Sequence, residues 1–358
     1  YISMKQHTKD ILNQWNLLKP LRDAVKDKLY HKFSLEFNFN SNHIEGNTLT
    51  YGQTEALLLF GKVIGEAKMK DLEEMKAHNI GLKMVLEEAM TSNPLTETFI
   101  RQLHKILLRE DYTVYRNLPG GVTTSYTVHA GCYKTRPNSV ITTSGERFEY
   151  ASPEETPMLM ADIIQWYQTE EAKAELNPLE LAALFHYRYN RIHPFEDGNG
   201  RIARLMVNYI LARHNYPLIV VPTKTKQEYL RALSSVDTAV GKEPTPGARA
   251  SLNQIQPFVS YLEKLMTLEM QTDIAIAQGS GRQWWFNGGW VSFNSSIVEK
   301  IIHEIQADPH ISIRALANKL SVNTSAIQKH IKMLKDRGYI IREGSVTRGT
   351  WRVLLTRL

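Results

Sequence analysis

The sequence predicts a mainly helical protein: a large helical core that carries a β-hairpin, followed by a small C-terminal domain of three helices and two strands. Three observations support this fold class. Up to about residue 277, most segments place apolar residues three and four positions apart, as in amphipathic helices. Residues 112–150 are rich in Thr, Val, Tyr and Gly, which favour short strands and turns. From Asn294 onward, three helical segments precede two strand-like runs.

Composition limits the class of protein. The chain has 358 residues, of which 42% are hydrophobic and 22% charged, as expected for two or three globular domains with a sizeable core. No apolar run approaches the ~20 residues that span a bilayer, and the first residues lack the apolar stretch of a signal peptide. The single cysteine, Cys132, excludes an internal disulfide framework. We therefore expect a cytoplasmic protein with no membrane partner.

The charge distribution divides the chain. Residues 291–358 contain eleven Lys and Arg but five Asp and Glu, a net charge of +6, whereas the preceding residues are neutral overall. We predict an N-terminal helical region at 1–110, a core at 111–277, a linker at 278–290 and a C-terminal domain at 291–358. The basic character belongs to the C-terminal domain, which bears on its partners.

The N-terminal region reads as successive helices. Residues up to Leu29 have a helical pattern, and residues 31–46 form a further helix that Gly46 ends as a left-handed cap. Thr50 and Gln53 are spaced as a capping box for the next helix. Residues 71–90 and 96–109 give two more helices.

The middle of the chain leads into one loop. After the strand-forming stretch, residues 153–167 and 177–192 are predicted helices, the second with Asn177 as N-cap and Pro178 in its first position. His186 lies two turns before the end of that helix, and we interpret it as a packed core histidine. Residues 255–270 form the last predicted helix of the core.

The loop at residues 193–204, HPFEDGNGRIAR, holds the candidate chemistry. His193 titrates near neutrality and could take a proton from a hydroxyl. Gly198 and Gly200 let an anion approach the free backbone N–H groups of the helix that begins here. Arg201 and Arg204 add bidentate charge for phosphate oxygens. Asp197 suits Mg²⁺ that is shared with phosphates and water.

The residues of this loop also fit two other patterns. Gly198, Gly200 and Ala203 also satisfy the dinucleotide fingerprint G-x-G-x-x-[GA], but that fingerprint follows a β-strand, whereas a helix precedes this loop. A plain helix-loop-helix with solvated charges would explain a lone His or Arg. The joint arrangement favours an anion site.

The string HPFEDGNGRIAR resembles the signature of Fic proteins, H-P-F-x-[DE]-G-N-G-R-x-x-R, at every fixed position. The resemblance implies a Fic helical core and the transfer of AMP from ATP, with Mg²⁺, to a hydroxyl of a target protein. It makes His193 the general base and Asp197 the metal ligand. It also implies nucleotide contacts from the loop and from the segment at 225–233: Gly198, Asn199, Gly200, Arg201, Arg204 and Tyr229.

Two further segments gain meaning from this resemblance. Ser41-x-x-x-Glu45-Gly46 resembles the family's inhibitory motif, [ST]-x-x-x-E-[GN], in which the glutamate pairs with a phosphate-binding arginine, here Arg204. The segment before the helix that Pro153 opens corresponds to the family's flap, which grips the target by strand addition. We place the flap at residues 138–150; an ordinary connecting hairpin is the alternative.

The C-terminal domain resembles a winged helix. In a DNA reader of this type, Ser325, Gln328, Lys329 and Lys332 of the third helix face the major groove. Winged helices also dock proteins or form dimers, so DNA and a second copy of the chain both stay open as partners. The alternatives to an adenylyltransferase are a DNA-binding regulator with a nucleotide-sensing core, or a Fic enzyme that transfers another phosphate-linked group or removes AMP.

Overall fold

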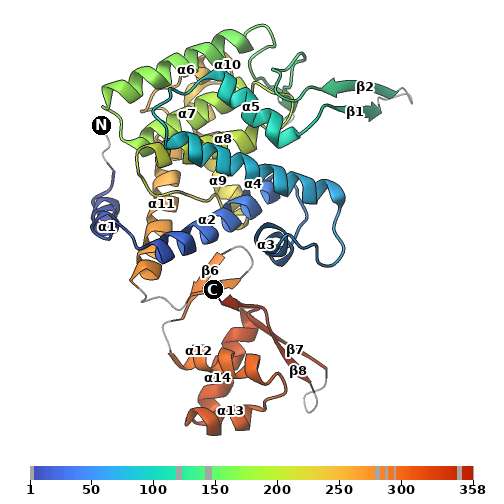
Figure 1. Ribbon diagram of the computed structural model, residues 1–358, viewed down its shortest axis with the longest axis vertical. Coiled ribbons are helices and arrows are strands. Elements are labelled where there is room, and N and C mark those ends of the chain that lie inside the picture. Colours follow the sequence, from blue (N-terminus) through green and yellow to red (C-terminus); the bar gives the residue numbers. More distant parts are fainter. Residues whose placement is uncertain are drawn as a thin grey trace. The chain divides into compact units, whose positions relative to one another are not determined.

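The computed structural model describes residues 4–117, 123–141, 147–278, 283–286, 289–293, 296–344 and 349–357. The chain forms two compact units, Tyr1–Ile274 and Ala275–Leu358. The predicted fold class is confirmed, with a mainly helical core, a β-hairpin and a C-terminal winged helix (Figure 1). None of the described helices has both the length and the apolar character needed to cross a membrane.

Eleven α-helices are described before residue 278. They are α1 (Gln6–Leu17), α2 (Asp23–Ile44), α3 (Tyr51–Phe60), α4 (Met69–Ala89), α5 (Glu97–Leu108), α6 (Thr156–Lys173), α7 (Pro178–Ile192), α8 (Asn199–Arg213), α9 (Lys226–Val240), α10 (Pro244–Ala248) and α11 (Gln256–Ala277), with a 3-10 turn at Thr223–Thr225.

Local sequence explains where several of these helices begin. Thr50 accepts a hydrogen bond from the Gln53 N–H (3.2 Å), and the Gln53 side chain accepts one from the Thr50 N–H (2.9 Å), so the predicted capping box before α3 is present. Asn177 and Glu180 form the same arrangement before α7, with Pro178 in the first turn. These caps satisfy N–H groups that have no partner inside the helix.

Helix α2 is longer and more buried than the predicted helix at 31–46. It begins at Asp23 and ends at Ile44, and Gly46, two residues beyond its end, has φ +98°. Its buried asparagines bond to carbonyls of their own helix: the Nδ2 of Asn40 donates to Glu36 (2.9 Å) and that of Asn42 to Asn38 (2.8 Å). The amide nitrogens of both side chains thereby keep a hydrogen bond although they are buried.

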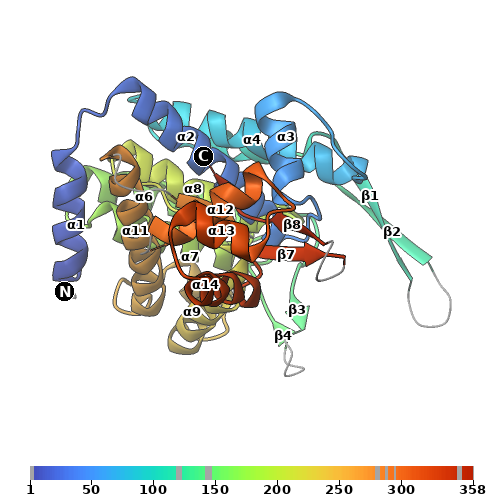
Figure 2. The same ribbon diagram turned by 90° about the horizontal axis from the view of Figure 1, so that it is seen from below.

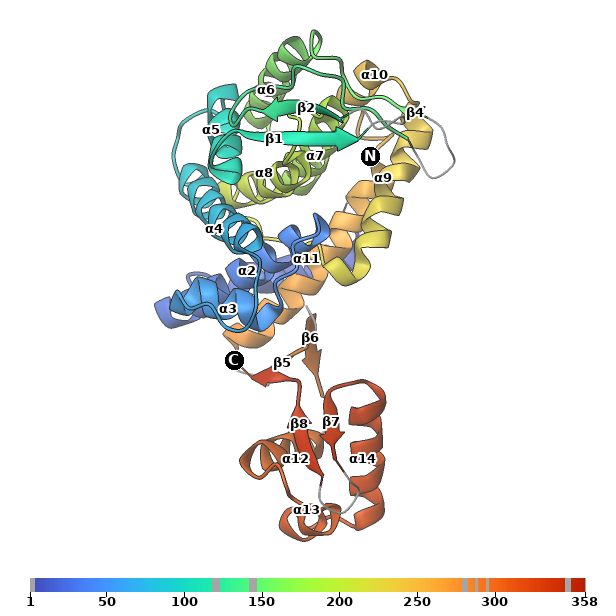
Figure 3. The ribbon, with the colours of Figure 1, turned by 90° about the vertical axis from the view of Figure 1, so that its right-hand side faces the viewer.

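Helix α8 lies inside the first unit, in contact with α2, α4, α5 and α7 (Figures 1 and 3). The predicted apolar face is buried, but so is the opposite face, where Arg201 is 6% and Arg204 3% exposed. Asn208, on that face, exchanges two hydrogen bonds of 2.9 Å with the backbone of Ile219. A helix buried on all sides forces its charged residues to find partners within the protein.

Two antiparallel hairpins separate α5 from α6. Strands β1 (Tyr112–Asn117) and β2 (Thr123–Val128) pair along their length and extend away from the helices (Figure 2). Strands β3 (Val140–Ile141) and β4 (Arg147–Phe148) form a short pair inside the segment predicted as the flap. The residues between β3 and β4, 142–146, lie outside the described part of the chain.

The second unit is a winged helix with an added sheet. Its elements are α12 (Ser296–Ala307), α13 (Ile313–Leu320), α14 (Thr324–Asp336), β5 (Gln283–Phe286), β6 (Gly289–Ser292), β7 (Ile340–Glu343), β8 (Thr350–Val353) and β9 (Thr356–Arg357). Strands β7 and β8 pair with each other, and β5 lies between β6 and β9. Part of the segment predicted as a linker at 278–290 thus forms strands, and Trp284 is buried in the core of this unit.

Candidate active site at the N-terminus of helix α8

His193 lies at the junction between α7 and the loop. It caps the C-terminus of α7 with a left-handed backbone (φ 51°, ψ 60°), which is uncommon for a residue other than glycine. Its N–H donates to the Tyr189 carbonyl (2.9 Å). Helix α8 then begins at Asn199, after Gly198 with φ +81°. The loop therefore places an imidazole next to the N-terminus of a buried helix.

The loop between these helices is tightly fixed. The Oδ1 of Asn199 accepts from the Phe195 N–H (3.0 Å), and its Nδ2 donates to the Phe195 carbonyl (2.7 Å). The Phe195 ring is buried and stacks on His104, with 3.8 Å between ring centroids. The Asn199 side chain thus closes the loop. The N–H groups in the first turn of α8 have no partner within the helix and remain suited to an anion.

Arg204 binds to the helix that carries Ser41 and Glu45. Its Nη2 donates to Glu45 Oε1 (2.7 Å) and to the Ser41 carbonyl (2.9 Å), and its Nε donates to Ser41 Oγ (3.0 Å). Although burial raises it, the pKa of Glu45 is held below its usual value by the charge and hydrogen bond of Arg204. Glu45 and Arg204 therefore form an ion pair at neutral pH.

The Glu45 carboxylate also occupies the space beside Gly200. A Cβ at position 200 would collide with Glu45 Oε1 and come within 3.2 Å of Arg204 Nη1. The carboxylate therefore lies against the first turn of α8, where negative charge is favoured by the helix dipole. A phosphate directed to the same N–H groups and the same guanidinium would compete with it.

A buried histidine from α4 fixes the Ser41 hydroxyl. The Nδ2 of Asn38 already donates to Ser34 and Asn79, so its Oδ1 accepts from the His78 Nδ1–H (2.6 Å). Burial lowers the pKa of His78 well below its usual value, so its other ring nitrogen carries a lone pair. Ser41 Oγ donates to that nitrogen (3.1 Å) and keeps its own lone pair for Arg204. In this series of hydrogen bonds, Arg204 donates to Ser41, Ser41 donates to His78, and His78 donates to Asn38.

The hydrogen bonds from Asn38 through His78 and Ser41 to Arg204 predict the effect of Ser41→Ala. The variant leaves the Nε of Arg204 and the Nε2 of His78 unpaired in a buried region, and an unsatisfied buried group costs about 1–3 kcal/mol. We expect the free energy of unfolding to fall by about 2 kcal/mol in urea titrations. Ser41→Thr, which keeps the hydroxyl, should lose less. Equal stability of Ser41→Ala and wild type would contradict this hydrogen-bond scheme.

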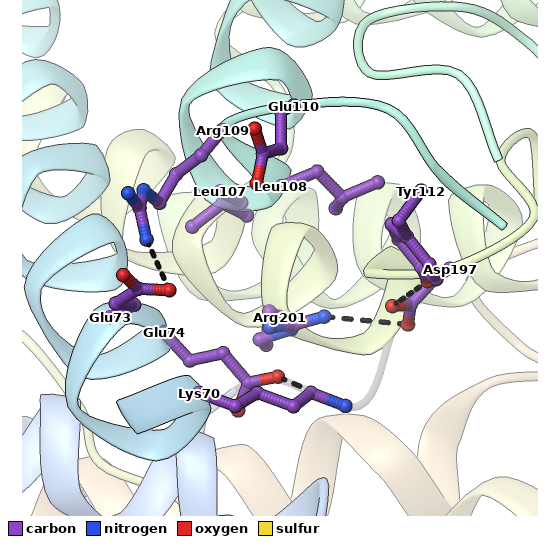
Figure 4. A pocket seen from close by; sticks show the side chains of 10 residues that line it. All are labelled: Lys70, Glu73, Glu74, Leu107, Leu108, Arg109, Glu110, Tyr112, Asp197 and Arg201. Atoms are coloured by element: carbon purple, nitrogen blue, oxygen red, sulfur yellow. Dashed lines mark hydrogen bonds and ion pairs between the residues drawn. The ribbon is translucent and has the colours of Figure 1, made fainter. Parts of the chain in front are cut away.

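Asp197 faces a pocket of about 280 Å³ (Figure 4). Its Oδ2 accepts from the Tyr112 hydroxyl (2.8 Å), and its Oδ1 accepts from the Gly198 N–H (2.6 Å) and lies 3.3 Å from Arg201 Nη2. Lys70, Glu73, Glu74, Leu107, Leu108, Arg109 and Glu110 complete the lining.

The donor set of this pocket agrees with a magnesium ion held jointly with phosphates. No group of three or more His, Cys, Asp or Glu that could bind a metal by itself is found in the described residues. Mg²⁺ in phosphate sites is commonly bound through one or two carboxylates, with phosphate oxygens and water supplying the other ligands. Asp197, half-exposed beside Arg201, fits that role.

The surroundings of His193 keep its imidazole neutral. Burial first, and then the Lys134 cation, lower the pKa of His193 to about 4. The ring of Tyr150, two residues after the end of β4, stacks on the imidazole with 4.0 Å between centroids and an interplanar angle of 18°. A neutral imidazole held in one orientation can accept a proton at pH 7.

Tyr229 lies beside Arg204 and pairs with His186. The hydroxyl of Tyr229 and the Nε2 of His186 are 2.9 Å apart, and both residues are buried. His186 also packs against Phe258, with 4.7 Å between ring centroids, in keeping with a core histidine. Tyr229 neighbours the Arg204 guanidinium, and its contact with a nucleotide stays a prediction.

Four residues of the site were absent from the sequence prediction: His78, Tyr112, Lys134 and Tyr150. Each touches the loop or the Ser41–Arg204 contact from an element distant in the sequence. No local pattern marks them. The nearest signal was the position of Tyr150 at the end of the predicted flap.

Comparison with known proteins places two segments of the chain in known families. Residues 94–211 match the Fic/DOC family, and residues 295–341 match the family described as "Winged helix-turn-helix DNA-binding". Protein adenylyltransferase fic-1 of Caenorhabditis briggsae is 30% identical over 268 residues, which cover 74% of this chain and 46% of that protein. The chain thus spans about half the length of the curated relatives it matches.

Two solved structures extend this result. A Fic domain containing signaling protein from Bacteroides thetaiotaomicron is 49% identical, with a TM-score of 0.72, over 76% of this chain and 97% of its own. A Fic family protein from Desulfovibrio desulfuricans shares the fold at 18% identity, with a TM-score of 0.52, over 98% of this chain and 97% of its own. The chain is therefore a member of the Fic/DOC family that carries a C-terminal winged helix-turn-helix domain.

Proposed function

We propose that this protein transfers AMP from ATP to a Tyr, Thr or Ser hydroxyl of a target protein. The observation that carries the proposal is the meeting of three features at one helix N-terminus: the neutral imidazole of His193, free N–H groups, and the guanidiniums of Arg201 and Arg204. Such a site suits a polyphosphate beside a base. The similarity to protein adenylyltransferases at 30% identity supports the same reaction.

The proposed reaction is an in-line displacement at the α-phosphorus. His193 takes the proton of the target hydroxyl as its oxygen bonds to phosphorus, and the bond from the α-phosphorus to the bridging oxygen of the β-phosphate breaks. Pyrophosphate leaves with that oxygen. The N–H groups of Asn199 and Gly200, together with Arg201, stabilise the charge on the transferring group, and Arg204 positions the γ-phosphate. The Gly198 N–H donates to Asp197 Oδ1 instead. Most of the rate then comes from positioning and electrostatics.

Asp197 would hold magnesium, which would neutralise phosphate charge when bound. Tyr112 and Arg201 orient the carboxylate, and Tyr112 would have to release Oδ2 or share it with the ion.

Glu45 makes the described state an inhibited one in this proposal. Its carboxylate neutralises the arginine assigned to the γ-phosphate and lies against Gly200. ATP can then bind only with its terminal phosphate displaced, which moves the α-phosphorus away from the line of attack.

The target is proposed to reach His193 along the flap at 138–150. Strands β3 and β4 lie in this segment, and Tyr150 connects its end to the imidazole. An extended target segment that adds a strand here would bring its hydroxyl to the base.

Labelled ATP separates AMP transfer from its alternatives. In a Glu45→Gly background with cell lysate, we expect protein to gain covalent label from α-labelled ATP and none from γ-labelled ATP. Label from the γ-position alone would mean phosphate transfer instead. Release of AMP from labelled protein, without incorporation, would mean that the protein removes AMP.

DNA binding by the second unit is a further candidate function. The match to winged helix-turn-helix DNA-binding domains covers α12–α14, and the predicted contacts Ser325, Gln328, Lys329 and Lys332 are all exposed on α14. Two exposed lysines at helical spacing suit phosphate contacts.

The DNA hypothesis predicts a salt-dependent gel shift. Replacing both Lys329 and Lys332 with alanine should weaken binding and reduce the slope of log affinity against log salt by about 2, because each lost phosphate contact removes about 1. Lys300→Ala on α12 serves as the matched control. Absence of any shift at low salt would exclude this function and leave the unit as a protein-docking module.

A further inference from the structure

Lys134 is a buried cation that no part of the proposed reaction uses. It is 3% exposed, and its ammonium donates to three oxygens: Asn138 Oδ1 (2.9 Å), the Ile192 carbonyl (3.1 Å) and the His193 carbonyl (2.9 Å). An ammonium has three N–H donors, so all of them are engaged. The Lys134 N–H also donates to the Pro194 carbonyl (2.8 Å).

The carbonyls of Ile192 and His193 lie at the C-terminus of α7. The last carbonyls of a helix have no partner within it and carry partial negative charge, so a cation is favoured there. His193 itself has a left-handed backbone, which persists only where its surroundings enforce it. The Lys134 ammonium donates to the Ile192 carbonyl, which precedes His193, and to the carbonyl of His193 itself. These two hydrogen bonds constrain the backbone conformation of His193 directly.

Asn138 connects the same carbonyls to the flap. Its Nδ2 donates to the carbonyls of His193 (3.1 Å) and Phe195 (2.9 Å), while its Oδ1 accepts from Lys134. Asn138 begins the segment at 138–150 that is proposed to hold the target. The base and the first residue of the flap thus share one hydrogen-bonded cluster.

We propose that Lys134 is a positioning residue for the transfer reaction. It holds the His193 backbone in its left-handed conformation and connects His193, the general base, to Asn138, the first residue of the flap. The proposal rests on the role of His193 in AMP transfer. Lys134 contacts no substrate and acts through His193.

Lys134 also changes the electrostatics of the base. Apart from burial, it is the largest influence that lowers the pKa of His193, opposed by the Asn190 backbone and by the carboxylates of Glu45 and Asp197. Tyr150 is a further ionisable side chain packed on the imidazole. Burial lowers the pKa of Lys134 to about 7, and Glu155 opposes this shift. Removing the cation should therefore raise the pKa of His193.

The test compares Lys134→Met with Lys173→Met, a surface control on α6, both in the Glu45→Gly background. We expect Lys134→Met to lower kcat about 100-fold, the scale of a 1 Å misplacement of a reacting group, with KM for ATP nearly unchanged. The acidic limb of the rate against pH should move to higher pH. Lys134→Arg keeps the charge and should leave that limb in place.

A second measurement is independent of catalysis. NMR titration of the His193 imidazole, assigned by its loss in His193→Ala, should show a higher pKa in Lys134→Met than in the wild type. If Lys134→Met does not fold, Lys134→Gln is titrated instead, with the same rise expected. An unchanged kcat, or an unchanged His193 pKa, would overturn the proposal. If no variant transfers AMP, the NMR result still decides the role of Lys134, while the proposed function fails on its own.

Discussion

His193→Ala should abolish AMP transfer while ATP still binds. A positioned general base contributes about 10²–10⁴-fold to a reaction rate, so the residual activity should fall by at least that range. The phosphate contacts come from the N-terminus of α8 and from Arg201 and Arg204, which the substitution does not touch. The rate of label transfer from α-labelled ATP and calorimetric titration with ATP measure the two effects separately.

The control is the substitution His303→Ala, at an exposed histidine on α12, which should retain full activity.

In the enzyme that keeps His193, the rate of AMP transfer should fall as the pH drops through about 4, because protonation of His193 removes the base below that value. Above about pH 5, His193 is neutral, and its titration should leave the rate unchanged. Full activity of His193→Ala would show that another group takes the proton.

Glu45→Gly should raise AMP transfer. The variant frees Arg204 Nη2 and clears the space beside Gly200, so that the γ-phosphate can take both. A hydrogen bond between charged groups contributes about 1.5–3 kcal/mol, and because the Glu45 side chain is 40% exposed we take the lower end. This corresponds to about a tenfold increase in rate at subsaturating ATP.

Glu45→Gln provides the graded comparison. The amide has the size of the carboxylate but no charge, so its transfer rate should lie between those of the wild type and Glu45→Gly. ATP affinity measured on the same three proteins should rise in the same order. Transfer by Glu45→Gly at or below the wild-type rate would mean that the Glu45–Arg204 pair does not restrain the enzyme.

Much of the fold follows from local patterns in the sequence. The capping box at Thr50 and the Asn177–Pro178 start of α7 were predicted because such caps depend on neighbouring residues alone. The helices α12–α14 and the strands β7 and β8 of the winged helix were predicted because their apolar patterns and turn residues are also local features of the sequence. The extent of α2 was not, because its start at Asp23 lacks a side-chain cap and its buried asparagines disguise the core face.

Some residues of the candidate site could be recognised from the sequence, and others could not. The loop from His193 to Arg204 is continuous in sequence, so its residues could be assigned before the structure was known. His78, Lys134 and Tyr150 reach this loop from three other segments, and their roles arise only from packing. The sequence also could not show that the Asn199 side chain closes the loop on Phe195, because that use depends on the turn geometry.

A nucleoside triphosphate is expected to bind at the N-terminus of α8 beside His193. A crystal structure of Glu45→Gly with ATP and Mg²⁺ tests it most directly. We expect phosphate oxygens on the N–H groups of Asn199 and Gly200, the γ-phosphate on Arg204, the metal on Asp197, and the α-phosphorus open to a hydroxyl that approaches His193. Nucleotide bound elsewhere, with this helix start empty, would contradict it.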